Sequence, residues 1–253
     1  MNLLIIRSKL IALTVILLTL ISCEKNIKIN KFLIVSHQGY WKASEGAQNS
    51  IRALLETVRL NIEGVELDVR ITTDNHLILH HDSRAGDYII ENSKLTDIRT
   101  LILSDGSCIP TLDEYFVVAQ EYKDLQLYID IKTQESIKPV INKIIEYNLS
   151  DRVILLTTYD IGLAVISNNT NIKIHCLSNS HPLRIKESGF SGIAYSINFI
   201  KQHPAWIYLA QNIGLTVGTW VIKSESEIIW CSQNNIEYVI TDSPLECKHY
   251  LYQ

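Results

Sequence analysis

The sequence predicts an α/β fold of the (β/α)8 TIM-barrel type, in which eight parallel strands alternate with helices. The apolar residues switch repeatedly from a period of two, typical of strands, to a period of about 3.6, typical of helices. The length of 253 residues suits one barrel of this kind. A doubly wound open sheet is the alternative, but the Gly-rich loop that binds nucleotides in such sheets does not follow the first predicted strand.

Residues 1–22 predict a cleaved export signal. Arg7 and Lys9 precede the apolar run LIALTVILLTLIS, which has the length of a signal-peptide core and is short for a transmembrane helix. The run ends in LISC, which resembles the lipobox of bacterial lipoproteins, so Cys23 is the predicted lipidated N-terminus. An ordinary signal peptide and an uncleaved anchor are the alternatives. We therefore expect an exported protein of the cell envelope, bound to a membrane by a lipid anchor on the periplasmic or outer-membrane side.

The first predicted strand is FLIVSH, and the first helix is AQNSIRALLETVRL, whose apolar residues fall at helical spacing. Two strands, VELDVR and HLILHH, then follow with too few residues between them for a helical crossover. This connection is the irregular one of the barrel, and Asp74-Asn75 is a plausible tight turn within it. If these two residues form the centre of a hairpin, Asp68 lies opposite His81. If the strands are parallel instead, their ends still lie at one rim.

The later part of the chain predicts regular strand–helix units after a polar, irregular segment at residues 83–109. The helix TLDEYFVVAQEY begins with a capping box formed by Thr111 and Glu114. Pro139 is expected to kink or delay the helix at residues 134–148. The remaining predicted strands are LQLYIDIK, RVILLTT, IKIHCLS, GIAYSI, GLTVGTWVI and EYVITDSP.

The composition is that of an ordinary globular protein, with 47% hydrophobic and 20% charged residues. The formal net charge is −4 and no run of Lys and Arg occurs, so no nucleic-acid partner is expected, and nothing implies a protein partner. No linker divides residues 23–253, which predict a single domain. Four cysteines after Cys23 lack metal-site spacing and allow three pairings, with isolated buried thiols at least as plausible. They are Cys108, Cys176, Cys231 and Cys247.

Acidic and imidazole side chains collect at the ends of the predicted strands, where barrel enzymes keep their active sites. His37 ends the first strand, Glu66 and Asp68 share one face of the second, and His81 and Asp130 lie at the ends of later ones. Three carboxylates in one cavity repel each other and so require a cation, and oxygen ligands suit Ca²⁺ or Mg²⁺. Imidazoles beside such a cation predict phosphoryl chemistry with the imidazoles as base and acid.

The motifs of the chain, in order, resemble those of the glycerophosphodiester phosphodiesterase family over essentially all of residues 23–253. They are SHQGY, AQNS, VELDVRITTDNHLILHHD, LYIDIK, TVGTWVI and YVITDSP. This family consists of barrel phosphodiesterases. The resemblance implies metal-dependent hydrolysis of glycerophosphodiesters to glycerol 3-phosphate and an alcohol, with a small phosphodiester as the substrate.

The resemblance also implies a role for individual residues. His80 is expected to be structural, because strand alternation turns it away from His81. Trp220 matches an aromatic residue near the alcohol part of the substrate, although a side chain that plugs the barrel is nearly as plausible. The implied residues are His37 and His81 as general acid and base, Glu66, Asp68 and Asp130 as ligands of one divalent cation, and Gln38, Lys132 and Trp220 as substrate contacts.

Three positions depart from the family pattern. Gln38 stands where the family has Arg, Gln48 stands where it has Glu, and Asp130 is one methylene shorter than the usual Glu. Gln has neither the charge nor the fork geometry of Arg as a phosphate contact. A member that binds phosphodiesters or phospholipid headgroups with impaired turnover is therefore one alternative. A related barrel phospholipase is another, but it requires an apolar rim and residues 83–109 are mostly polar.

Overall fold

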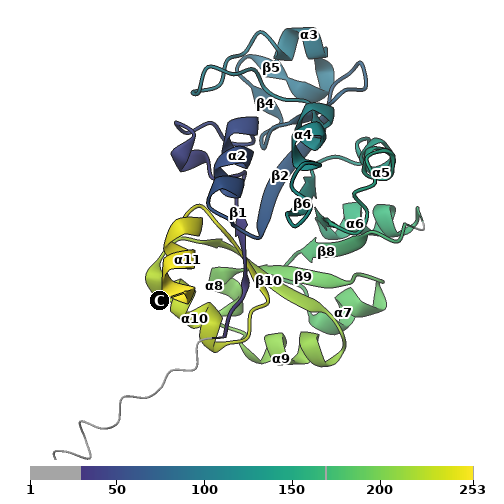
Figure 1. Ribbon diagram of the computed structural model, residues 1–253. Coiled ribbons are helices and arrows are strands. Elements are labelled where there is room, and N and C mark those ends of the chain that lie inside the picture. The colour runs from purple at the N-terminus through teal and green to yellow at the C-terminus, as the bar shows by residue number, and fades with distance from the viewer. Residues whose placement is uncertain (1–29, 169, 253) are drawn as a thin grey trace, which may run out of the picture.

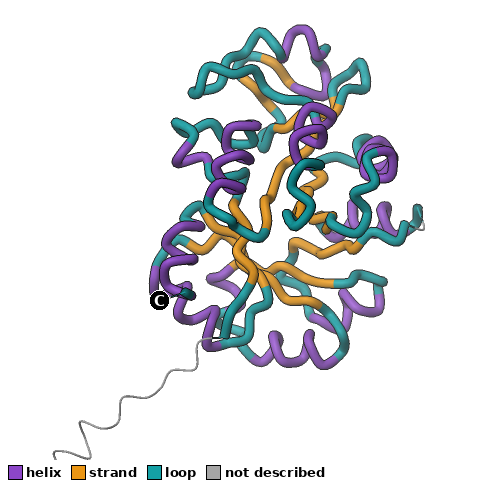
Figure 2. Tube along the Cα trace, in the orientation of Figure 1, coloured by secondary structure: helices purple, strands orange, loops and turns teal. Residues whose placement is uncertain are grey.

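The structure, a computed structural model, describes residues 30–168 and 170–252 and contains a closed barrel of eight parallel strands (Figures 1 and 2). The barrel closes because β1 pairs with both β11 and β2. This confirms the predicted (β/α)8 fold. The eight strands are β1 (Leu33–Ser36), β2 (Gly64–Ile71), β6 (Gln126–Ile131), β7 (Val153–Thr157), β8 (Lys173–Leu177), β9 (Gly192–Ser196), β10 (Thr216–Ile222) and β11 (Tyr238–Thr241).

Helices follow the barrel strands and cover their outer face (Figure 1). Thr111 and Glu114 form the predicted capping box, and Pro139 lies in the first turn of a helix that begins at Ile137. A final helix, which was not predicted, begins with Pro244 directly after the last strand. The helices are η1 (Trp41–Ala43), α2 (Ile51–Arg59), α4 (Leu112–Ala119), α5 (Ile137–Glu146), α6 (Tyr159–Ile166), α7 (Pro182–Glu187), α8 (Ile197–Ile200), α9 (Ala205–Asn212), α10 (Glu225–Gln233) and α11 (Pro244–Leu251).

The predicted signal segment and Cys23 lie outside the described residues. Within residues 30–168 and 170–252, no helix is both long and apolar enough to cross a membrane. Cys108, Cys176, Cys231 and Cys247 are all free thiols, and the last three are buried. The isolated-thiol interpretation is therefore the one that the structure supports.

The irregular connection is a hairpin, but its predicted register is wrong by one residue. β3 (Leu77–Leu79) runs antiparallel to the end of β2 and pairs Val69 with Leu79. The loop has three residues rather than two, because Thr72 donates its amide to the carbonyl of His76 and Asn75 adopts a left-handed φ of 63°. Asp68 consequently lies opposite His80, whose amide donates to the Asp68 carbonyl at 3.1 Å.

The segment after β3 forms a small insertion at the C-terminal end of β2, at the top of Figure 1. It has an apolar core of its own, formed by Ile78, Ala85, Ile90, Ile98 and Ile109. This core explains why a largely polar segment folds against the barrel. Its elements are β4 (Arg84–Ala85), β5 (Tyr88–Ile89), η2 (Ile90–Asn92) and α3 (Leu95–Ile98).

Large rings fill the interior of the barrel beneath the carboxyl ends of the strands. The rings of Tyr128 and Tyr238 lie 4.9 Å apart, and His175 Nδ1 lies 3.0 Å from the Tyr238 hydroxyl. Two glycines make room for them: a Cβ at Gly218 would lie 2.1 Å from the Tyr238 ring, and one at Gly192 would lie 2.5 Å from His175. Each glycine is therefore required by the close approach of a ring.

His175 is a buried titratable group, and burial lowers its pKa to about 3. Its exposed fraction is 1%, so the neutral imidazole is the form that fits the barrel interior. In the unfolded chain its pKa returns to about 6.5. Because the folded pKa is the lower one, its contribution to stability is complete above pH 6.5 and is lost as the pH falls toward 3.

We expect His175→Gln to reduce the loss of stability between pH 7 and pH 5 by about 2 kcal/mol, because Gln does not bind the proton that unfolded His175 takes up. Urea unfolding at both pH values, in the presence of chelator, measures this difference. His249→Gln, at an exposed position on α11, is the matched control. An unchanged difference between pH 7 and pH 5 in His175→Gln would contradict the prediction.

Candidate active site

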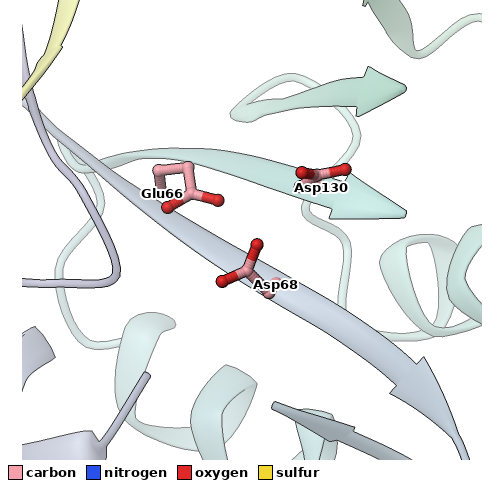
Figure 3. A group of neighbouring side chains, drawn as sticks. All are labelled: Glu66, Asp68 and Asp130. Atoms are coloured by element: carbon pink, nitrogen blue, oxygen red, sulfur yellow. The ribbon is translucent and has the colours of Figure 1, made fainter. Parts of the chain in front are cut away.

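Three carboxylates meet at the carboxyl ends of two neighbouring strands. Glu66 and Asp68 lie two residues apart on β2, and the parallel register places Asp130 of β6 beside Asp68. One carboxylate oxygen of each residue lies within 4.8 Å of the others. Figure 3 shows the three side chains on the two neighbouring strands. Their exposed fractions are only 3%, 1% and 9%. Strand alternation and register therefore produce the acidic cluster that the sequence predicted.

Lys132 is the cation that faces this cluster. Its Nζ lies 2.8 Å from Asp68 Oδ1 and 2.6 Å from Asp130 Oδ2. It reaches both because it lies two residues after Asp130 on the same face. One ammonium balances one of the three carboxylates, so two negative charges remain when all are ionised. This surplus matches the charge of a divalent cation.

The electrostatics of the cluster depend on burial and mutual repulsion. Burial, followed by the charges of Asp68 and Asp130, raises the pKa of Glu66 well above its usual range. Burial also acts to raise the pKa of Asp68, but the charge and hydrogen bond of Lys132 outweigh it and lower that pKa. Burial and the charges of Asp130 and Asp68 act in opposite directions on Lys132, and the charges prevail and raise its pKa. Glu66 is thus the carboxylate that most lacks a positive partner.

The three carboxylates could hold a hard divalent cation. Ca²⁺ binds oxygen at about 2.3–2.6 Å, so two of its ligands can lie about 4.6–5.2 Å apart. The oxygens of the cluster already satisfy that limit. Mg²⁺ binds at about 2.0–2.1 Å and would require oxygens no more than about 4.2 Å apart. Oxygens that all lie within 4.8 Å of one another are therefore compatible with either cation.

His37 follows β1 and is oriented by a carboxylate from the last strand. Its Nδ1 lies 2.7 Å from Asp242 Oδ1, which also accepts a hydrogen bond from Trp41 Nε1. Since a carboxylate accepts, Nδ1 carries the proton and Nε2 is left as the free nitrogen, 4.0 Å from Glu66 Oε2. Burial acts to raise the pKa of Asp242, but the hydrogen bond and charge of His37 outweigh it and lower that pKa.

His81 lines the same pocket and also holds its Nδ1 against a carboxylate. Its Nδ1 lies 2.7 Å from Asp82 Oδ1, which leaves Nε2 free, and its side chain is half exposed. Arg70 donates to the His81 carbonyl and pairs with Glu91 of the insertion, which fixes the backbone of this segment. Two imidazoles with carboxylate partners therefore border the acidic cluster.

Gln38 and Asn49 hold the acidic cluster from behind. Gln38 donates its backbone amide to Glu66 at 2.9 Å and its Nε2 to Asp68 Oδ2 at 2.6 Å. Asn49 Nδ2 also donates to Asp68 Oδ2, and its Oδ1 accepts from the Asp68 amide. The neighbouring Gly39 has φ of 75°, and a Cβ there would lie 2.7 Å from that of Ala53. The tight turn after β1 is therefore built to bring these donors to the carboxylates.

The predicted site residues line one pocket of about 270 Å³, together with Leu156, Leu177 and Ile240. Trp220 lies at its mouth, 36% exposed, and donates its Nε1 to the Ala194 carbonyl. It does not plug the barrel, because the tyrosines and His175 fill that space. Gln38 alone among the predicted residues lies behind the pocket rather than on its wall. A larger groove of about 730 Å³ between α10 and α11 contains none of these side chains.

Sequence reasoning missed Asp242, Trp41 and Asn49. Asp242 lies in the motif YVITDSP, and the closure of the barrel places the end of β11 beside that of β1. A closed topology therefore predicts that His37 and Asp242 are neighbours, and this signal was present in the sequence. Trp41 and Asn49 lie in the loop after β1, where no period indicates the direction of a side chain.

Comparison with known proteins agrees with this geometry. Residues 37–246 match the family described as the Glycerophosphoryl diester phosphodiesterase family. A glycerophosphodiester phosphodiesterase of Caldanaerobacter subterraneus subsp. tengcongensis is 25% identical over 234 residues, which cover 85% of this chain and 95% of that protein. These matches confirm the family and the enzyme class that the motifs predicted.

Solved structures show the same architecture. A glycerophosphodiester phosphodiesterase from Parabacteroides distasonis has a TM-score of 0.85 and 26% identity, and the match covers 89% of this chain and 98% of that one. A phosphodiesterase from Oleispira antarctica, solved with the product sn-glycerol-3-phosphate, has a TM-score of 0.75 and 17% identity, with 87% and 97% covered. The second likeness concerns the fold alone. Because the family match spans most of the barrel, the chain belongs to the glycerophosphoryl diester phosphodiesterase family.

Proposed function

We propose that the protein hydrolyses glycerophosphodiesters to glycerol 3-phosphate and an alcohol, with the help of one divalent cation. The observation that carries the proposal is the convergence of three buried carboxylates, Lys132 and two carboxylate-bound imidazoles on one pocket. The resemblance at the motif level assigns the same side chains to this reaction. Family membership supports the phosphodiester class of substrate.

Glu66, Asp68 and Asp130 are the proposed ligands of the cation, and their oxygens suit Ca²⁺ or Mg²⁺. A bound cation neutralises the charge of the phosphodiester and polarises phosphorus toward attack. Lys132 supplies a second positive charge at the same wall. Asp130 is shorter than the usual Glu, yet it lies within the group of three oxygens, so its length does not remove it from the site.

His37 and His81 are the proposed base and acid. Each holds its Nδ1 proton on a carboxylate, so each presents Nε2 for proton transfer. One imidazole, neutral with a free Nε2, takes the proton of the hydroxyl that attacks phosphorus. The other enters the step as the imidazolium and gives its Nε2 proton to the oxygen of the leaving alcohol. Gln38 adds no positive charge, and the loss of one preorganised stabiliser costs on the order of 10²–10³ in rate. We therefore expect a slower enzyme rather than an inactive one.

We also propose that the chain is exported and anchored to a membrane of the cell envelope through lipid on Cys23. The proposal is based on the apolar run that ends in LISC. An anchored barrel would meet water-soluble phosphodiesters released from phospholipid at that surface.

Expression of the full chain in a bacterium should give a membrane-bound product, and Cys23→Ser should remain unprocessed or be released. Incorporation of a labelled fatty acid, followed by fractionation, measures the outcome. Cys108→Ser is the matched control, because it removes a cysteine of the folded domain. Equal labelling of the protein and of Cys23→Ser would refute lipidation at this residue.

We expect residues 24–253 to release glycerol 3-phosphate only when a divalent cation, Ca²⁺ or Mg²⁺, is present. His37→Ala should lower kcat by about 10²–10⁴-fold, because a general acid–base group contributes that much. It should still bind Ca²⁺, measured by calorimetry, because the carboxylates remain. His249→Ala is the matched control, since its side chain is exposed on α11. Full turnover in chelator would contradict the metal role, and Ca²⁺ binding without any turnover would favour a binding protein.

Asp242→Asn should lower kcat by on the order of 10²–10⁴-fold and leave KM within a few-fold, because Asp242 acts on His37 and does not line the pocket. An Asn at this position does not stabilise the positively charged imidazole of His37. It also permits the His37 tautomer that carries its proton on Nε2. Steady-state kinetics on a good substrate measures both constants. If KM instead rose by a similar factor while kcat stayed unchanged, Asp242 would serve substrate binding rather than the orientation of His37.

A further inference from the structure

A second groove of about 510 Å³ adjoins the pocket that holds the carboxylates, and the two share His37 and His81. We call this groove the alcohol chamber. Since both imidazoles border both spaces, a phosphodiester whose phosphate lies at the carboxylates extends past the imidazoles into the chamber. The chamber is therefore the space available to one of the two ester substituents.

The walls of the alcohol chamber come from two loops that are far apart in the sequence. One wall is residues 46–49 after η1, and the other is residues 102–104 of the insertion. The walls approach each other closely, since a Cβ at Gly46 would lie 3.6 Å from Ser104 Oγ. Ile102 is 62% exposed and thus offers apolar surface at the chamber edge.

One residue of the chamber wall carries a buried acceptor that has no partner. Gln38 lines the chamber and is 3% exposed. Its Nε2 must face Asp68, because a carboxylate only accepts, and this leaves Oε1 buried without a hydrogen bond. A buried polar atom without a partner costs about 1–3 kcal/mol. A donor from a bound molecule would satisfy it.

The side chains that line the alcohol chamber indicate which kind of substrate group could donate this hydrogen bond. Among the described residues that line the chamber, there is no Lys or Arg to attract an anionic substituent and no Phe, Tyr or Trp to form a cage for a quaternary ammonium. Asp82 is already bound to His81. The Gln38 carbonyl, the Gln48 amide and the Ser104 hydroxyl remain, and these suit neutral hydroxyl groups.

We propose that the alcohol chamber binds the leaving alcohol and selects for a neutral polyhydroxylated one, such as glycerol, inositol or a sugar. This inference rests on the proposed phosphodiesterase function, and it replaces the position near Trp220 that the resemblance implies for the alcohol. In the reaction, the bond between phosphorus and the polyol oxygen breaks, and a bond from phosphorus to the attacking oxygen forms. The polyol oxygen takes a proton from an imidazole, and over the whole cycle one water is consumed. Gln38 Oε1 accepts a hydrogen bond from a polyol hydroxyl.

The test compares four substrates: glycerophosphoglycerol, glycerophosphoinositol, glycerophosphocholine and glycerophosphoserine. With residues 24–253 and Ca²⁺, we expect kcat/KM for the two polyol esters to exceed that for the other two by roughly tenfold, as one or two hydrogen bonds would give. Ile102→Lys places a cation at the chamber edge and should raise the relative rate on the serine ester several-fold. Ile145→Lys changes an equally exposed apolar residue on α5, outside the chamber, and should leave the order of substrates unchanged.

Binding to His37→Ala, measured by calorimetry with the same four compounds, separates this inference from the proposed function. Tighter binding of the polyol esters without turnover by the unaltered chain would support the chamber and refute the enzyme. Turnover of all four esters at equal rates, with Ile102→Lys indistinguishable from Ile145→Lys, would refute the chamber and leave the enzyme intact. Preference for the choline ester would likewise overturn the proposal.

Discussion

The burial of three carboxylates at the ends of β2 and β6 is the constraint on which the rest of the site depends. Isolated buried charges are costly, so such a cluster persists only when cations and hydrogen-bond donors surround it. Lys132 supplies one positive charge, and donors from Gln38 and Asn49 bind Glu66 and Asp68. The tight turn after β1 exists to deliver those donors. Its left-handed residues are therefore explained by the acidic cluster rather than by the barrel.

Closure of the barrel is what brings His37 to its carboxylate partner Asp242. β1 lies between β2 and β11, so a residue directly after β1 contacts both the acidic cluster and the end of the last strand. His37 occupies that position, with Asp242 on one side and Glu66 on the other. An open sheet with the same strands would separate His37 from Asp242. The fold thus determines the orientation of the imidazole as well as its place.

The sequence was sufficient to predict the features that follow from the alternation of side chains along a strand and from the pairing of parallel strands. Alternation placed Glu66 and Asp68 on one face, and the parallel order of strands placed Asp130 beside them. It was insufficient where a single residue in a loop decides the geometry. The hairpin register depended on whether the loop held two residues or three, and Asn75 in a left-handed conformation made it three. Long-range approaches of loops, such as the one that brings Gly46 and Ser104 to the same groove, have no periodic signal at all.

Gln38 and Gln48 both depart from the family pattern, and their effects on charge are best considered together. Relative to the family pattern, the first removes a positive charge and the second removes a negative charge, so the formal charge around the carboxylates is preserved. Locally, Gln38 donates its Nε2 to Asp68, and its buried Oε1 is left without a hydrogen-bond partner on a residue that lines the neighbouring groove. An Arg side chain has no acceptor. Under the two proposals above, Gln38 therefore contributes less to phosphate binding than Arg would, and its Oε1 binds a hydroxyl of the alcohol instead.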